Sequence, residues 1–247
     1  MTTNPMVYFG VIALGAFLIG LSKGGLGGTL GALITPLLSL VMPIDQAIGI
    51  ALPILIVGDL FALAAHWGNW DRRLTWLLLP GALIGITLGT FVLTNISTLI
   101  LKRSLAVIIF IFIIYKLFEG QMIGRLHYRA YRWHGWLAGS VAGFASTLAH
   151  AGGPPVIIYL LLQDVTPIVF VATSILFFAV TNWIKVPYYY RAGLLNLQAL
   201  LQIVWLAPLV PLGVWVGRRL AQKSDQLVFD RIILALLGIS GIFLLFS

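Results

Sequence analysis

A chain of 247 residues that is 60% hydrophobic and 9% charged has too little polar surface to fold as a water-soluble domain. Its net charge of +8 does not indicate a nucleic-acid-binding patch, because the basic residues lie mostly between apolar segments, and we expect no nucleic acid among its partners. Cysteine is absent, which excludes disulfides, thiolate metal sites and cysteine nucleophiles.

Ten apolar segments follow one another along the chain. Several approach the roughly 20 residues that a helix needs to cross a bilayer, and they are apolar all round instead of alternating at period two. They lie at 6–22, 26–42, 47–66, 74–93, 101–118, 134–149, 153–163, 168–189, 198–217 and 229–246. The sequence therefore predicts an all-α polytopic membrane protein with eight to ten hydrophobic segments.

A polar stretch, EGQMIGRLHYRAYRW, divides these segments into two sets of five. It predicts a first membrane repeat at 1–118, a cytoplasmic linker at 119–133 and a second membrane repeat at 134–247. The arginines, tyrosines and tryptophan of the linker are typical of chain that lies against anionic lipid headgroups, so membrane lipid is an expected partner.

The two sets resemble each other in sequence. At an offset of 128, Pro80 matches Pro208 and Gly85 matches Gly213, and at an offset of 125 the pair Gly27–Gly28 matches Gly152–Gly153. Packing alone explains many of the other glycines, which recur every fourth residue at 81–89 and 135–143. The matches predict an internal duplication.

Charge indicates how the two copies are oriented. If each half opens with a hairpin or with two crossings, ten basic residues share one side of the membrane and four lie on the other, which is a usable positive-inside bias. If each half opened with one continuous span, the tally would fall to about eight against six. The larger group is Arg72, Arg73, Lys116, Arg125, Arg129, Arg132, Arg218, Arg219, Lys223 and Arg231. The smaller is Lys102, Arg103, Lys185 and Arg191. The halves then have odd crossing numbers and opposite orientations, with the linker inside and both termini outside.

Each predicted half opens with an interrupted helix. The interruptions read GLSKGGLGGTLGA at 20–32 and TLAHAGGPPV at 147–156. Broken helices in lipid leave backbone N–H groups and a positive dipole end that an anion can satisfy, and glycine lets the anion approach. Paired breaks in inverted halves predict a substrate site, with Gly24, Gly27, Gly28, Gly152 and Gly153 as backbone contacts.

Few ionisable residues lie within the apolar segments, and each has two interpretations. Lys23 either neutralises the anion or extends to the nearer surface. His150 either donates a hydrogen bond or is a structural histidine, and Asp59 either couples transport or pairs with a nearby base. Asn182 and Lys185 lie near the equivalent depth of the second half and join the predicted substrate-binding set. The other histidines, at 66, 127 and 134, are expected at the interface.

The motifs GLSKGGLGG, AHAGGPPV and TSILFFAVTNWIKVPYY resemble those of the sulfite exporter TauE/SafE family of membrane permeases, from about Gly10 to the C-terminus. The resemblance implies a secondary transporter, an exporter of a small sulfur-containing anion such as sulfite or an organosulfonate, in the cytoplasmic membrane of a bacterium. It supplies no residue roles, so the candidate site depends on the physical argument above.

Other functions find less support. The chain has no ATP-binding Gly-x-x-x-x-Gly-Lys-Ser/Thr loop, no His-Glu-x-x-His and no pair of membrane aspartates, so we expect neither an enzyme nor a cofactor or metal. A scaffold subunit would need no paired breaks. The main alternative is a proton- or cation-coupled importer of a small organic anion. The oligomeric state stays open.

Overall fold

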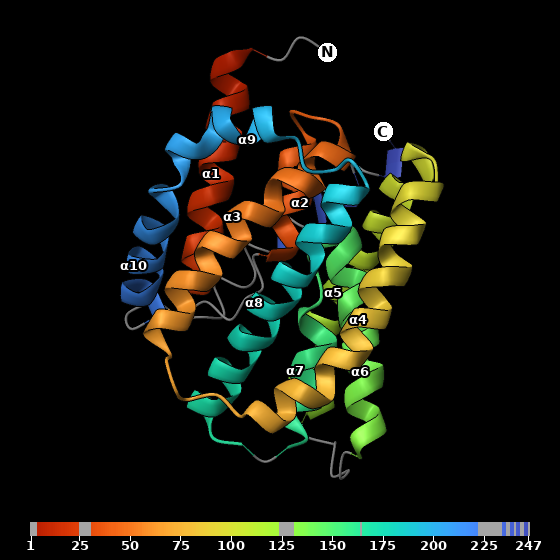
Figure 1. Ribbon diagram of the computed structural model, residues 1–247, viewed down its shortest axis with the longest axis vertical. Helices are drawn as coiled ribbons and strands as arrows, with labels where there is room; N and C mark the ends of the chain where they lie inside the picture. The colour runs from red at the N-terminus through yellow and green to blue at the C-terminus, as the bar shows by residue number, and fades with distance from the viewer. Residues whose placement is uncertain are drawn as a thin grey trace.

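The computed structural model describes residues 4–24, 31–123, 131–163 and 165–221, with 234–235, 238–239, 241–242 and 245–246 near the C-terminus (Figure 1). Within these ranges the chain is helical and contains no strand. The helices are α1 (Pro5–Lys23), α2 (Gly31–Ser39), α3 (Ile44–Ala65), α4 (Arg72–Asn95), α5 (Thr98–Ile123), α6 (Arg132–Ala149), α7 (Gly153–Leu161), α8 (Pro167–Arg191), α9 (Leu197–Ile203), the 3₁₀ turn η1 (Val204–Leu206) and α10 (Leu209–Ala221).

Five of the described helices are long and apolar enough to cross a membrane: α1, α3, α4, α5 and α8. A sixth span is possible if α9–η1 and α10, bent by 51°, count as one. The first nine predicted segments each contain a helix, which confirms the all-α polytopic fold; the tenth falls mostly outside the described residues. Helix α5 continues to Ile123, five residues into the predicted linker.

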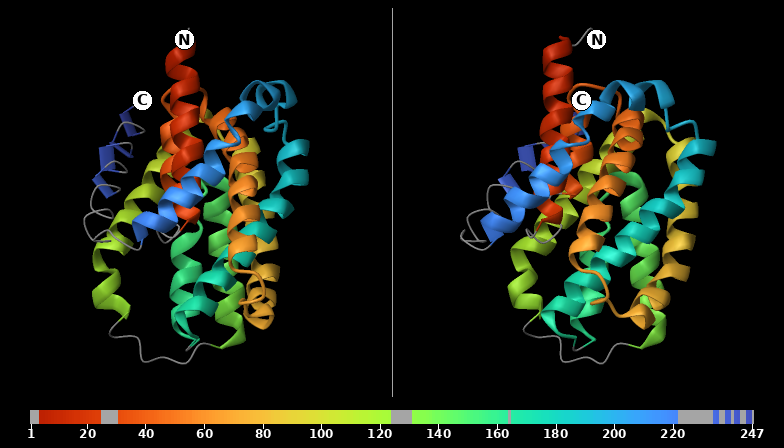
Figure 2. Two further views of the ribbon diagram at one scale, coloured as in Figure 1. Left: turned by 90° about the vertical axis from the view of Figure 1, so that its left-hand side faces the viewer. Right: turned by 60° about the vertical axis from the view of Figure 1, so that its left-hand side comes forward.

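The two short helices explain the interruptions in the sequence. Helices α2 and α7 have nine residues each, or roughly 14 Å, about half of a bilayer core. Helix α1 enters from the end of the molecule marked N, and α2 lies back towards that end (Figure 1). Helix α6 enters from the other end, and α7 returns to it (Figures 1 and 2). Each half therefore opens with a broken hairpin, and the two hairpins point in opposite directions.

Glycine contacts show that the halves repeat one packing arrangement. Helix α1 packs mainly on α10, and α6 packs mainly on α4. Gly20 of α1 lies so close to the carbonyl of Val210 that a Cβ would overlap it, and a Cβ on Gly143 of α6 would likewise overlap the carbonyl of Ala82 on α4. The same backbone approach thus occurs once in each half.

A second pair of contacts has the same correspondence. A Cβ on Gly213 would overlap the carbonyl of Phe17, and a Cβ on Gly85 would overlap that of Ser140. A shift of 123 residues takes α1 onto α6, and a shift of 128 takes α4 onto α10, in both pairs of contacts. Together with the opposed directions of α1 and α6 in Figure 1, this match supports the inverted repeat that the sequence predicts.

The turns after α3 and α8 are also equivalent. Gly68 and Gly193 have φ of +80° and +71°, values that glycine adopts without the steric cost of a Cβ. Three residues later, Asp71 and Asn196 cap the next helix by accepting a hydrogen bond from the third backbone N–H after them, at 3.2 Å in each case. A glycine followed by an Asp or Asn cap therefore reverses the chain in each half.

Pro80 and Pro208 mark a difference in shape between the described parts of the two halves. Helix α4 continues through Pro80 without a break. At the equivalent Pro208 the chain divides into α9–η1 and α10, which meet at 51°. Proline removes a helical hydrogen bond at either site, so both positions are weak points of the helix, and the helix divides at one of them.

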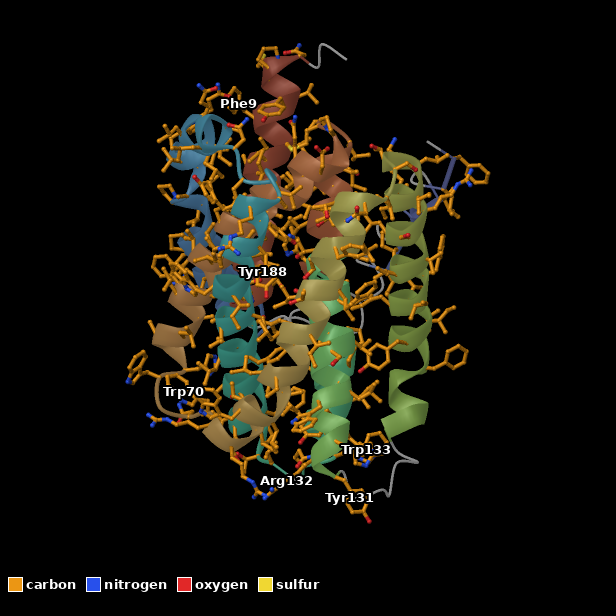
Figure 3. All side chains as sticks on the ribbon, turned by 45° about the vertical axis from the view of Figure 1, so that its right-hand side comes forward. Phe9, Trp70, Tyr131, Arg132, Trp133 and Tyr188 are labelled. Atoms are coloured by element: carbon orange, nitrogen blue, oxygen red, sulfur yellow. The ribbon has the colours of Figure 1, made fainter. Side chains whose placement is uncertain are left out.

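Aromatic and basic side chains gather at one end of the molecule, where α3 ends and α6 begins. Trp70, Tyr131, Arg132 and Trp133 all lie at this end (Figure 3), which we call the linker end. Phe9 lies at the opposite end (Figure 3). The turn at 66–71 and the end of the linker are thus on one side, as the charge pattern predicts, and amphipathic rings at that level are typical of a membrane interface.

Candidate functional site

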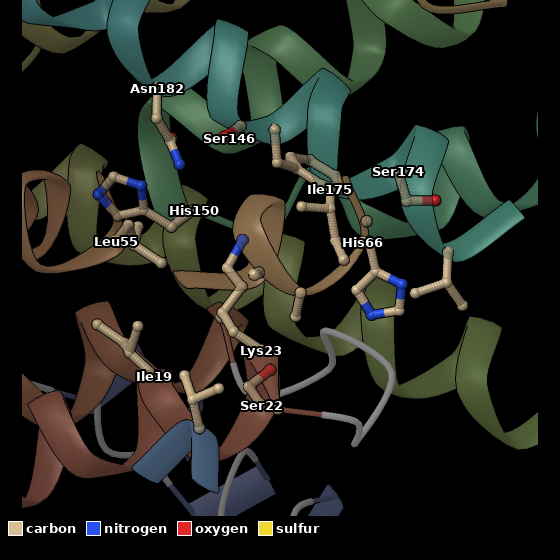
Figure 4. Close-up of a pocket in the computed structure, with 18 of the residues that line it drawn as sticks. Ile19, Ser22, Lys23, Leu55, His66, Ser146, His150, Ser174, Ile175 and Asn182 are labelled. Carbon is tan, nitrogen blue, oxygen red and sulfur yellow. The ribbon is translucent and has the colours of Figure 1, made fainter. Parts of the chain in front are cut away.

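A cavity of about 820 Å³ lies where the two helix breaks meet (Figure 4). Gly24 and Gly31, on either side of the first break, line it, and so do His150 and Gly153 at the second. A Cβ on Gly31 would lie 3.4 Å from the carbonyl oxygen of His150, which shows how close the breaks are. The predicted convergence of the breaks is thus present in their described parts, while Gly27 and Gly28 lie outside the described residues.

The cavity extends from the middle of the molecule towards the linker end. On α3 it is lined by Leu55, Ala62 and Ala65, all from the second half of the helix, and by His66, which directly follows the helix. On α8 its lining residues run from Phe170 to Asn182 and do not reach the last turns. On α3, Ile44, Ile48 and Leu52, nearer the opposite end, are buried in the core. His66, expected at the interface, lines the outer part of the cavity.

An ion pair and a hydrogen bond to the same carboxylate join three helices at the inner end of the cavity. Lys23 Nζ donates to Asp59 Oδ1 at 2.5 Å, and Asn182 Nδ2 donates to Asp59 Oδ2 at 2.6 Å. Lys23 and Asn182 line the cavity, whereas Asp59 is 1% exposed and lies behind them. Both carboxylate oxygens therefore have strong partners, which favours the paired interpretation of Asp59 over a free coupling group.

A second buried cation is held by neutral groups. Lys185 is fully buried on α8, and its ammonium contacts Ser146 Oγ at 3.0 Å, Ser146 O at 3.3 Å and His150 Nδ1 at 3.2 Å. Three acceptors match the three donors of an ammonium group. Lys185 does not itself line the cavity; Ser146 and His150 stand between it and the open space.

The contacts of His150 fix its tautomer. Its Nε2 lies 3.1 Å from the carbonyl oxygen of Ile48, an acceptor, so Nε2 carries the hydrogen. Nδ1 then accepts from the Lys185 ammonium, and the ring is neutral. His150 also has φ of +53°, which is costly for a residue with a Cβ. This left-handed residue ends α6 and turns the chain into the second break.

The two adjacent glycines of the second break have different surroundings. A Cβ on Gly152 would lie 2.5 Å from the carbonyl oxygen of Ala142, so Gly152 serves the packing of the break on α6. A Cβ on Gly153 would meet only Ile157 Cδ1, at 3.9 Å, and Gly153 lines the cavity. Pro154 and Pro155 have no N–H, so Gly152 and Gly153 supply the amide donors at the beginning of α7.

Five predicted site residues line the cavity: Lys23, Gly24, His150, Gly153 and Asn182. Gly152, Asp59 and Lys185 lie behind its wall. Sequence reasoning missed Ser22 and Ser146, which also line it. Ser22 precedes Lys23 directly, and Ser146 lies one helical turn before His150. Their closeness to these two predicted site residues could have indicated that they line the cavity.

Charge within the described part of the site is unequal. Lys23 and Lys185 are two cations, and Asp59 is the one carboxylate that contacts either of them. The remaining lining residues are mostly apolar, with Ile157, Val171, Ile175, Phe178 and Val214 among them. Uncompensated positive charge in a medium of low polarity attracts anions strongly, so the arrangement is suited to binding an anion.

The protein-family model described as Sulfite exporter TauE/SafE matches residues 12–244, nearly the whole chain. No curated protein and no solved structure matches the chain significantly.

Proposed function

Because the chain belongs to the sulfite exporter TauE/SafE family, a family of membrane transporters, we propose that it exports a small sulfur-containing anion, such as sulfite or an organosulfonate. The proposal places it as a multi-pass protein in the cytoplasmic membrane of a bacterium, with the small anion and membrane lipid as its partners. It requires neither catalysis nor a cofactor.

The observation that carries the proposal is the buried positive charge at the meeting point of the two breaks. Lys23 borders the cavity directly, and Lys185 lies one residue behind it. The proposed substrate neutralises this excess charge and accepts hydrogen bonds from the amide of Gly153 at the beginning of α7 and from the polar residues around Lys23.

The position of the cavity is consistent with loading from the cytoplasm. It extends to the linker end, which the positive-inside rule assigns to the cytoplasm. The membrane potential then favours export, because one elementary charge that crosses 100 mV gains about 2.3 kcal/mol and a dianion roughly twice that. An exporter of this kind needs no coupling ion.

The alternative, a proton- or cation-coupled importer, needs a group that takes up the coupling ion. Asp59 was the candidate, and both of its oxygens are engaged by Lys23 and Asn182. These contacts support uniport.

The test is sulfite efflux from liposomes that contain the purified protein, at equal pH on both sides. We expect efflux to accelerate when valinomycin and a potassium gradient set the interior negative. Flux that responds to a pH gradient but not to the potential would support the coupled importer. Failure to transport sulfite, taurine or sulfoacetate would contradict the proposal.

A further inference from the structure

Ser22, at the end of α1, has a hydroxyl group without a hydrogen-bond partner among the described residues. The residue is 4% exposed and lines the cavity beside Lys23 (Figure 4). Its Oγ is buried, and no atom of the described chain accepts from it or donates to it. Buried hydroxyl groups are almost always paired, so an unpaired one on a residue that lines a cavity has a donor available to a ligand there.

Ser146, on α6, has a hydroxyl group that is half satisfied. Its Oγ accepts a hydrogen bond from Lys185 Nζ at 3.0 Å, and its own hydrogen has no acceptor among the described residues. Ser146 lines the cavity, whereas Lys185 does not. A hydroxyl that accepts from an ammonium group is a stronger donor, because successive hydrogen bonds polarise each other. Ser146 thus presents the charge of Lys185 to the cavity.

The two serines occupy related places in the fold. The shift of 123 residues that takes α1 onto α6 places Ser146 at the position of Lys23, one residue after Ser22. Each hydroxyl group therefore lies at the inner end of the first helix of its half, and the two ends meet at the cavity. Each also has a cation next to it: Lys23 follows Ser22 in the chain, and Lys185 contacts Ser146.

We infer that Ser22 and Ser146 are substrate-binding residues, which donate from opposite halves of the protein to separate oxygens of one oxyanion. The inference rests on the proposed function and extends it to a substrate head group with two or more acceptor oxygens. Sulfite and sulfonates have such a head. Lys23 supplies the direct charge, and Ser146 transmits that of Lys185.

Ser174 provides a matched control. It lines the same cavity from α8, but its hydroxyl already donates to the carbonyl oxygen of Phe170 at 2.9 Å. It has no hydrogen left for a ligand. Removal of this hydroxyl should therefore leave anion binding unchanged, although the change in side-chain size equals that at Ser22 and Ser146.

The experiment measures sulfite affinity of the purified full-length protein by titration calorimetry, for wild type, Ser22→Ala, Ser146→Ala and Ser174→Ala. A hydrogen bond to a charged group typically changes affinity by about tenfold or more, so we expect Ser22→Ala and Ser146→Ala to bind at least about tenfold more weakly and Ser174→Ala to bind like wild type. Without ligand, Ser22→Ala should unfold at the wild-type temperature or above it, because an unpaired hydroxyl has been removed.

One further variant, Ser146→Thr, and the wild type keep the result unambiguous. Ser146→Ala also removes a partner of Lys185, so Ser146→Thr, which keeps the hydroxyl, should restore most of the affinity. Wild-type affinity in Ser22→Ala would overturn the inference, and so would equal weakening in Ser174→Ala. If wild type binds sulfite and all serine variants bind it equally, this inference alone fails. If wild type binds no anion, the proposed function fails with it.

Discussion

Lys23 and Asp59, 36 residues apart in the chain, form an ion pair in which Nζ and Oδ1 are 2.5 Å apart at the centre of the protein. The exposed fractions of the two side chains are 13% and 1%. Through Asn182 the same carboxylate also reaches α8, so one buried charge links α1, α3 and α8. Loss of either partner leaves a charge in an apolar surrounding.

Asp59→Leu should therefore destabilise the protein, by up to about 3–5 kcal/mol, because Lys23 would remain largely buried without its partner. The double variant Lys23→Met/Asp59→Leu should recover most of that loss and still transport sulfite poorly, since the direct cation of the site is gone. Thermal unfolding in detergent and liposome flux measure the two effects separately. A single variant as stable as wild type would contradict the assigned pairing.

The adjacent glycines of the second break should respond differently to substitution. Gly153→Val should fold normally and reduce sulfite flux strongly, because its side chain enters the cavity. Gly152→Ala should lower the unfolding temperature instead, because its Cβ would press on the Ala142 carbonyl. The abundance of folded protein in the membrane, measured by size-exclusion chromatography, and flux per folded molecule distinguish the two. Normal flux in Gly153→Val would show that the substrate does not approach this break.

Equivalent glycines in the two halves should be equally intolerant of a side chain. Gly85→Ala and Gly213→Ala each place a Cβ against a backbone carbonyl of the neighbouring helix, and we expect each to cost about 1–3 kcal/mol of unfolding free energy. Gly10→Ala is the control, because no atom lies within 4 Å of its Cβ position. Comparable thermal shifts in the first two and none in the third would support the repeat; a tolerant Gly213→Ala would count against it.

The orientation in the membrane can be tested with single cysteines, because the natural chain has none. The positive-inside bias predicts that Asn69→Cys, at the linker end, is protected from an impermeant maleimide in intact cells. Ser97→Cys, between α4 and α5 at the opposite end, should be labelled. After the cells are permeabilised, both should react. The reverse pattern in intact cells would invert the predicted topology and with it the direction of loading.

The membrane helices and their duplication were predictable because both follow from local chemistry. A bilayer requires long apolar segments with internally satisfied backbones, so the segments are visible in any window of the sequence. The match of Gly85 with Gly213 was visible for a related reason: close helix packing demands the absence of a side chain at a fixed position, and both copies kept it.

The details of the site were less predictable because they depend on contacts between distant segments. The partner of Asp59 on α8 is 123 residues away, and that of Lys185 on α6 is 39 residues away. The hydroxyl of a serine in an apolar helix usually donates a hydrogen bond to the backbone of its own helix, as that of Ser174 does. Only the folded structure shows that the hydroxyl of Ser22 lacks such a bond. The different surroundings of Gly152 and Gly153 likewise depend on the left-handed turn at His150.

The contrast between Pro80 and Pro208 has a consequence for how the protein changes conformation. The two halves share their glycine contacts but differ in shape: α4 continues through Pro80, whereas the chain at Pro208 divides into two helices that meet at 51°. We therefore expect a second conformation in which the two halves exchange shapes, so that the chain divides at Pro80 and continues through Pro208. In that conformation the cavity would open to the other side of the membrane.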